Sequence, residues 1–309
     1  MATPTEPRRP TSPPVQFLAP ERVLGEMAAH GAHRLHTLSA LQVFVLAVVG
    51  GGFITAGALF SVLLGAGVAS PGPQRLLEGL GFSAGFFFVI LSGAVLFTEA
   101  NVVMPATLLQ CDAARLARLV ARFWALAWLG NLAGAFVLGW LVYVAQDYSP
   151  DVTGLLAELV DRKMAWREAG GPEAWFELIL SGILANWLVG MAAFFAMMGR
   201  TIVGRYVPIF LAVTLFVAAN FQHSPANMGY FALIMPSGDG PGWAAALLWN
   251  ILPVGIGNVI GGSLLVVLPL WFGLTAHKRA ELVARVGDAA GGLGRGDAAG
   301  GSGRAEGDG

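Results

Sequence analysis

The stretch Phe221-Gln222-His223-Ser224-Pro225-Ala226-Asn227-Met228 decides the fold. It places polar side chains and a proline inside residues 206–238, a run without Asp, Glu, Lys or Arg that exceeds the ~20 residues of a membrane-spanning helix. Pro225 cannot donate a backbone hydrogen bond and disfavours helix at Ser224, so the pattern predicts a broken helix. A break at membrane depth needs partners in protein or water, and a histidine there indicates a functional site rather than a packing residue.

Composition places this stretch in a membrane protein. The chain has 309 residues, of which 56% are hydrophobic and 12% are charged, whereas soluble domains carry about 25% charged residues. Cys111 is the single cysteine, which excludes an intrachain disulfide and disfavours thiolate metal sites. The composition therefore predicts an all-α polytopic membrane protein, and it gives no indication of a cofactor, a bound metal or a nucleic-acid partner.

Both ends of the chain differ from its apolar middle. Residues 1–19 are rich in proline, without the apolar stretch of a signal peptide, and residues 278–309 are rich in Gly, Ala and Asp, so both are predicted to be disordered and cytoplasmic. The membrane domain is expected over residues 20–277. It should begin with a short amphipathic helix at the membrane surface, over about 20–36, in which His30, His33 and His36 are interfacial rather than metal ligands.

Six charge-poor stretches follow, and each is long enough to cross a bilayer. They cover Leu38–Ala66, Gly79–Thr98, Phe123–Gln146, Leu178–Gly199, Tyr206–Pro236 and Trp243–Ala276. With the N-terminus in the cytoplasm, all but four of the 18 Lys and Arg residues lie on the cytoplasmic side; the exceptions are Arg75, Arg162, Lys163 and Arg167. The positive-inside rule therefore predicts that both termini are cytoplasmic.

An internal repeat relates the two halves of the chain. Gly130-Asn131 in the third span recurs as Gly257-Asn258 in the sixth, an offset that carries Leu96-Phe97-Thr98-Glu99-Ala100-Asn101 onto residues 223–228. The second span is therefore predicted to be broken as well, with 102–109 forming a short half-helix. Because each half has an odd number of spans, the second half enters from the opposite side. This predicts an inverted 3+3 repeat with broken second and fifth helices that meet at a substrate path.

Several segments resemble the signatures of the formate/nitrite transporter family. They are Gly81-Phe82-Ser83-Ala84-Gly85, Gly93-Ala94-Val95-Leu96-Phe97-Thr98, Asn186-Trp187-Leu188-Val189, the stretch 221–228 and Gly257-Asn258-Val259-Ile260-Gly261-Gly262, in that order along residues 12–277. The resemblance implies an aquaporin-like bundle of six helices in the plasma or inner membrane, assembled as a homopentamer with one pore in each subunit. It implies transport of small weak-acid anions such as formate, nitrite, lactate or hydrosulfide, and no enzymatic activity.

The same resemblance assigns the pore residues. Its polar centre would be Thr98, His223 and Asn227. The outer apolar constriction would consist of Phe82, Phe86 and Phe216, and the inner one of Leu96, Phe97 and Val189. Lys163 resembles the basic residue of the outer vestibule, although Arg162 or Arg167 also fits this role because the spacing to Asn186 is longer than usual. Gln222 stands where the family commonly has Glu, which weakens the electrostatic support for a protonated His223.

A transport mechanism follows from the cost of moving charge. An anion loses much hydration free energy at an apolar constriction, whereas the neutral acid formed by taking up a proton does not. A basic vestibule would gather the anion before that step. A competing hypothesis is an intramembrane enzyme with His223 as base and Ser224 as nucleophile. It lacks the third orienting carboxylate or metal that such chemistry needs, because the spans contain no Asp and no second His.

Overall fold

A computed structural model describes residues 17–109, 113–273, 281 and 284. Its described part is helical, with one isolated antiparallel bridge between Phe17 and Gly199. The predicted disordered segments 1–19 and 278–309 lie largely outside the described residues. The elements run in the order α1 Pro20–Thr37, α2 Ala40–Gly65, α3 Pro71–Ser92, α4 Phe97–Val103, η1 Pro105–Leu109, α5 Ala113–Ala145, α6 Pro150–Ala169, α7 Gly171–Met198, α8 Ile202–Ala218, α9 Ser224–Ile234, η2 Met235–Ser237, α10 Trp243–Ala246, η3 Leu247–Ile251, α11 Leu252–Ile260, η4 Gly261–Val267 and α12 Leu268–Gly273.

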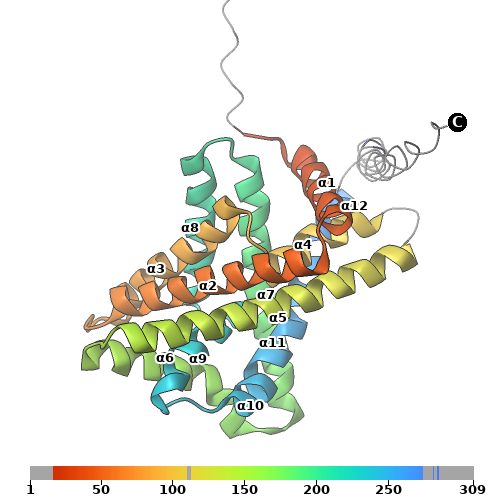
Figure 1. Ribbon diagram of the computed structural model, residues 1–309. Coiled ribbons are helices and arrows are strands. Elements are labelled where there is room, and N and C mark those ends of the chain that lie inside the picture. Colours follow the sequence, from red (N-terminus) through yellow and green to blue (C-terminus); the bar gives the residue numbers. More distant parts are fainter. Residues whose placement is uncertain (1–16, 110–112, 274–280, 282–283, 285–309) are drawn as a thin grey trace, which may run out of the picture.

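The predicted architecture of six crossings is confirmed. In the described part, five helices are long and apolar enough to span a membrane: α2, α3, most of α5, α7 and the continuous stretch 243–273. The remaining crossing is the shorter apolar helix α8, which is continued by α9 after a break. In Figure 1, α1 and α12 lie together at one end of the bundle, and α6 and α10 lie at the opposite end.

The two breaks lie a few residues before their predicted positions. The first covers residues 93–96, because Gly93 takes a left-handed conformation (φ 71°) and α4 starts at Phe97. The second covers residues 219–223, and Pro225 lies in the first turn of α9. The prediction placed the interruption at 96–101 and 221–228. Proline at a helix start removes an N–H that has no intrahelical partner in any case, so Pro225 begins the half-helix instead of breaking it.

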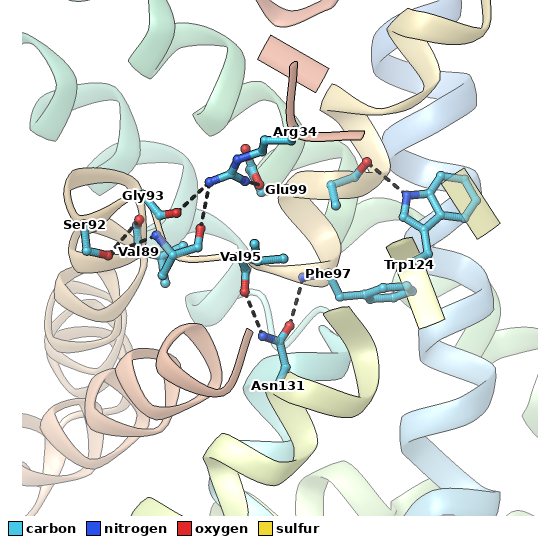
Figure 2. A network of polar contacts seen from close by, with 11 residues as sticks. Arg34, Val89, Ser92, Gly93, Val95, Phe97, Glu99, Trp124 and Asn131 are labelled. Atoms are coloured by element: carbon cyan, nitrogen blue, oxygen red, sulfur yellow. Dashed lines mark hydrogen bonds and ion pairs between the residues drawn. The ribbon is translucent and has the colours of Figure 1, made fainter. Parts of the chain in front are cut away.

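Asn131 of α5 holds the first break together. Its side-chain oxygen accepts the backbone N–H of Phe97 at 2.9 Å, and its Nδ2 donates to the carbonyls of Val95 at 2.9 Å and Ala47 at 2.8 Å. Figure 2 shows this amide between the extended strand-like segment and the start of α4. One fully buried asparagine thus satisfies backbone groups that the lipid phase cannot hydrogen-bond.

Asn258 of α11 repeats this arrangement at the second break. Its oxygen accepts the N–H of Ser224 at 2.8 Å, and its Nδ2 donates to the carbonyls of Gln222 at 3.3 Å and Gly182 at 2.8 Å. Leu96 and His223, the residues that precede the two half-helices, are related by the same offset as the two asparagines. The internal repeat therefore extends to individual hydrogen bonds.

Small residues allow the helices of each half to pack closely. A Cβ atom at Gly134 would collide with the carbonyl of Val48, and one at Gly261 would collide with the carbonyl of Ile183. These glycines occupy equivalent positions in the repeat, so α2 packs on α5 as α7 packs on the sixth crossing. Such close approach is the usual route to helix association in membranes.

Two elements outside the spans differ from expectation. Helix α1 forms as predicted, but its apolar face, with Val23, Leu24 and Met27, is buried against η1, α7 and α4 instead of facing the membrane surface. Helix α6 is not anticipated by the apolar pattern, because polar and apolar residues alternate along it without a continuous apolar run. It packs against α2, α7, α9 and η3 and covers one end of the bundle.

The hydrogen bonds of Asn131 and Asn258 to the two breaks predict an effect on stability. Asn131→Leu and Asn258→Leu keep the side-chain volume but leave a buried N–H and a break carbonyl without partners. Each unsatisfied group costs about 1–3 kcal/mol, so both variants are expected to lower the melting temperature of the detergent-solubilised protein, measured by tryptophan fluorescence. Gln146→Leu, at the exposed end of α5, is the control. Melting of both asparagine variants at the wild-type temperature would show that these hydrogen bonds do not stabilise the two breaks.

Candidate substrate pore

The two breaks bring Thr98 and His223 into contact at the centre of the bundle. Thr98 lies in the first turn of α4, His223 immediately precedes α9, and both side chains are buried. The distance between His223 Nε2 and Thr98 Oγ1 is 2.8 Å. The structure therefore joins two of the three residues predicted to form the polar centre.

The hydrogen bonds of His223 define its tautomer. Its Nδ1 accepts the backbone N–H of Ala226 at 3.2 Å and so carries no proton. In the neutral ring the proton then lies on Nε2, which donates to Thr98 Oγ1. Since the Thr98 oxygen accepts this bond, its own hydroxyl proton is free to donate elsewhere. The positive end of the α9 dipole adds a preference for partial negative charge at this point.

Asn227, the third predicted member of the polar centre, belongs to a separate amide network. Its Nδ2 donates to Asn250 Oδ1 at 2.6 Å and to Gln222 Oε1 at 3.0 Å. Gln222 Oε1 also lies 3.3 Å from Asn250 Nδ2, and Gln222 Nε2 donates to the Asn220 carbonyl at 2.7 Å. A Glu at position 222 would place a carboxylate oxygen against that carbonyl, so the amide fits this loop and an ionised acid does not.

Aromatic rings lead from one side of the bundle to His223. The rings of Phe82 and Phe216 meet edge to face at 5.7 Å, Phe82 stacks on Tyr230 at 6.1 Å, and the Phe216 ring centroid is 5.4 Å from that of His223. Phe86 is buried in the same cluster. Phe82, Phe86 and Phe216 thus belong to one buried cluster, and their role as a constriction stays a prediction.

The second predicted constriction is divided between two clusters. Leu96 and Val189 are fully buried in the same hydrophobic cluster as the aromatic rings. Phe97 packs instead with Val43 and Phe123, in a cluster between α2, α4 and α5. Leu96 and Val189 therefore belong to one apolar cluster and Phe97 to another, and the constriction that they were predicted to form stays a prediction.

A small cavity lies beyond the aromatic rings and is named here the α6 cavity. It measures about 20 Å³, and Lys163 lines it together with Glu78, Arg162, Phe82, Phe216 and Tyr230. The Lys163 ammonium lies 4.8 Å from the centroid of the Tyr230 ring, and Asn250 Nδ2 donates to the Lys163 carbonyl at 2.7 Å. Arg167, one of the alternatives for the vestibule base, is exposed and lines a different cavity.

Burial changes the chemistry of Lys163. Only 6% of the residue is exposed, and burial, reinforced by the neighbouring Arg162 charge, lowers the pKa of Lys163 to about 7. Glu78 opposes this shift. Lys163 therefore titrates near neutral pH, which makes the positive charge of the α6 cavity dependent on pH.

A larger cavity of about 250 Å³ lies on the opposite side of the breaks, under α1, and is named here the α1 cavity. Its lining includes Arg34, Glu99, His30, Arg200 and Arg205. Arg34 Nη1 pairs with Glu99 Oε2 at 3.3 Å, and Nη2 donates to the Gly93 carbonyl at 2.7 Å. Figure 2 shows the guanidinium between these groups. Arg34 thus attaches α1 to the first break.

Several of these residues received no functional assignment from the sequence alone. Glu78 and Glu99 are the charges that bracket the apolar run 79–98, and both are buried, at 2% and 7% exposure. An acidic residue at the edge of a span is the signal that could have identified them. Their partners Arg162 and Arg34 lie on α6 and α1, so the pairing itself depends on tertiary contacts.

Comparison with known proteins is consistent with this geometry. The family model for the formate/nitrite transporter matches residues 21–272. The chain is 28% identical to the "Formate channel FocA" of Escherichia coli over 284 residues, 84% of this chain and 95% of the relative. It is also 28% identical over 244 residues to the "Probable formate transporter" of Methanothermobacter thermautotrophicus, 75% of this chain and 88% of the relative.

Solved structures share the fold. A structure described as "FNT family ion channel" aligns with a TM-score of 0.66 at 24% identity, over 82% of this chain and 99% of the other. One described as "Pentameric formate channel with formate bound" aligns with a TM-score of 0.62 at 23% identity, over 75% and 96%. The protein is a multi-pass integral membrane protein and belongs to the formate/nitrite transporter family.

Proposed function

We propose that this protein moves small monovalent weak-acid anions, with formate and nitrite as the first candidates, through a pore that they cross as neutral acids. The observation that carries the proposal is the buried contact between Thr98 and His223, beside a cluster of buried apolar side chains that includes Phe82, Phe216, Leu96 and Val189. The names of relatives, which include a formate channel and the "Nitrite transporter NirC" of Escherichia coli, support these two substrates.

The geometry favours the neutral acid over the anion at the constrictions. The predicted constriction residues Phe82, Phe216, Leu96 and Val189 offer no donor to replace lost hydration. An anion gathered by Lys163 would take up a proton before it passes the rings. The free hydroxyl proton of Thr98 can then donate to the carbonyl oxygen of the acid at the centre of the pore.

We also propose the assembly and orientation that the sequence indicates. Both termini would be cytoplasmic, which places the α1 cavity on the cytoplasmic side and the α6 cavity outside. The protein would form a homopentamer in the plasma or inner membrane, with a pore in each subunit; the pentameric description of a structural neighbour supports this. Exposed large apolar residues on α2 and α5 provide surfaces for lipid and neighbouring subunits.

Hydrosulfide and lactate remain alternative substrates of the same pore. The enzyme hypothesis, in contrast, disagrees with the hydrogen bonds that Ser224 forms. The Ser224 hydroxyl donates to the Ile251 carbonyl at 3.2 Å and accepts from Trp128 Nε1 at 3.2 Å. His223 contacts Thr98 instead, so the proposed base does not activate the proposed nucleophile. The relatives are also named as a channel and a transporter, not as enzymes.

The substrate assignment is tested by uptake into liposomes that contain the purified protein. Formate, nitrite, lactate and hydrosulfide are compared at equal concentration across an imposed pH gradient, with protein-free liposomes as the control. We expect formate or nitrite to enter fastest, and faster when the outside is acidic. Protein-dependent uptake of none of the four would contradict the proposed function.

The Thr98–His223 contact predicts that formate uptake depends on the Thr98 hydroxyl and on the His223 ring nitrogens. Thr98→Val removes the hydroxyl while preserving shape, and His223→Phe removes both ring nitrogens. Each is expected to reduce formate uptake by about tenfold or more, since one well-formed hydrogen bond to a pore group accounts for about 1.4 kcal/mol. Thr98→Ser keeps the hydroxyl and should retain most of the activity. Wild-type, pH-dependent uptake by His223→Phe would contradict the assignment of the pore centre.

The pKa of Lys163 predicts a pH effect on apparent affinity. Below pH 7 the ammonium is charged and attracts the anion, whereas above pH 7 it loses its proton, so the KM for external formate should rise with pH. Lys163→Gln removes this change, and the ratio of its KM to the wild-type KM should be large at pH 6 and approach one at pH 8.5. A ratio that does not vary with pH would show that Lys163 does not titrate in this range.

A further inference from the structure

A buried carboxylate, Glu78, faces the partly exposed Arg162 beside Lys163 in the α6 cavity. Glu78 of α3 is 2% exposed, and its side chain packs against Gly65 of α2, where a Cβ atom would approach Glu78 Cγ to 2.9 Å. Gln74 Nε2 donates to Glu78 Oε1 at 2.9 Å, and Arg162 Nη2 lies 3.7 Å from the same oxygen. Gln74 and the packing against Gly65 therefore fix the carboxylate, and Arg162 approaches it without a hydrogen bond.

The guanidinium of Arg162 keeps unused donors. Its Nε lies 3.8 Å from the exposed Glu158 and its Nη2 lies 3.7 Å from Glu78, both beyond hydrogen-bond distance. Both nitrogens are enclosed, and neither has a hydrogen-bond partner among the described residues. Enclosed donors without partners are costly in a folded protein, and a small anion is the ligand that satisfies a guanidinium best.

The cavity limits what such an anion can be. Its volume of about 20 Å³ exceeds the space that one water molecule requires but leaves little more. Phe82 and Phe216 line it, so this space adjoins the aromatic rings of the predicted constriction. An ion of three heavy atoms, such as formate or nitrite, requires a small widening of this space, whereas lactate requires a larger one.

From this arrangement we propose that Arg162 is a second anion-binding residue of the α6 cavity. We also propose that the negative charge of Glu78 partly balances that of Arg162 and so limits the affinity of Arg162 for the anion. The inference rests on the proposed transport function and adds to it a residue pair that sets the affinity for the incoming anion. Lys163 supplies a charge that depends on pH, whereas Arg162 remains charged throughout. Glu78 keeps the net charge of the cavity low, which allows a bound anion to leave toward the constriction.

The test measures initial formate uptake against concentration in proteoliposomes, at low and high ionic strength. Every variant is also made in the Lys163→Gln background, because Glu78 and Arg162 shift the pKa of Lys163 in opposite directions. Glu78→Gln is isosteric and should lower KM about threefold to tenfold, where tenfold corresponds to about 1.4 kcal/mol, with little change in maximal rate. Arg162→Gln should raise KM by a similar factor and weaken its dependence on salt. Arg167→Gln removes the same charge from the exposed end of α6 and is the matched control.

The double variant Glu78→Gln/Arg162→Gln distinguishes two explanations: Glu78 weakens the binding of the anion to Arg162, or Glu78 repels the anion from a distance. Both side chains are neutral in this variant, so no buried carboxylate is left without a cation. If Glu78 acts through Arg162, Glu78→Gln lowers KM much less in the Arg162→Gln background than in the wild type. An equal effect in both backgrounds, or an unchanged KM for Arg162→Gln, would overturn the inference. Absence of uptake by the wild type would instead reject the proposed function.

Discussion

The structure depends on the need to satisfy backbone hydrogen bonds where two helices are interrupted inside the membrane. Asn131 and Asn258 meet this need with a single side chain each, which accepts an N–H at the start of a half-helix and donates to carbonyls before it. These hydrogen bonds position Thr98 and His223 where the half-helices begin. A polar contact can exist at the centre of an apolar bundle because the backbone around it is already satisfied.

In the proposed pathway, the charges of the two cavities would attract an anion without holding it in the constrictions. Arg34 pairs with Glu99 under α1, and Arg162 approaches Glu78 under α6, so each cavity holds a cation whose charge is partly balanced. Between the cavities lie aromatic and aliphatic side chains with no net charge. In the proposed mechanism, a weak acid would cross these environments by changing its protonation state, because the neutral form loses little free energy on leaving water.

Much of this arrangement could be predicted from sequence because charge-free runs and the 127-residue offset between Asn131 and Asn258 are direct consequences of membrane burial and duplication. The exact breaks could not, since Pro225 is equally compatible with ending a helix and with beginning one. Helix α6 lacked an apolar run, and the buried Glu78 finds its partner only through that helix. Among the site residues, Thr98 and His223 meet as expected, whereas Asn227 bonds to a network that no spacing indicated.

Simultaneous measurement of charge and proton movement tests the central claim most directly. Proteoliposomes loaded with a pH indicator are exposed to a formate gradient while a voltage-sensitive dye reports the membrane potential. The account predicts that one proton enters with each formate, so the interior acidifies and the potential stays unchanged. A formate-dependent potential that develops without internal acidification would contradict it, because the bare anion would then be crossing the constrictions.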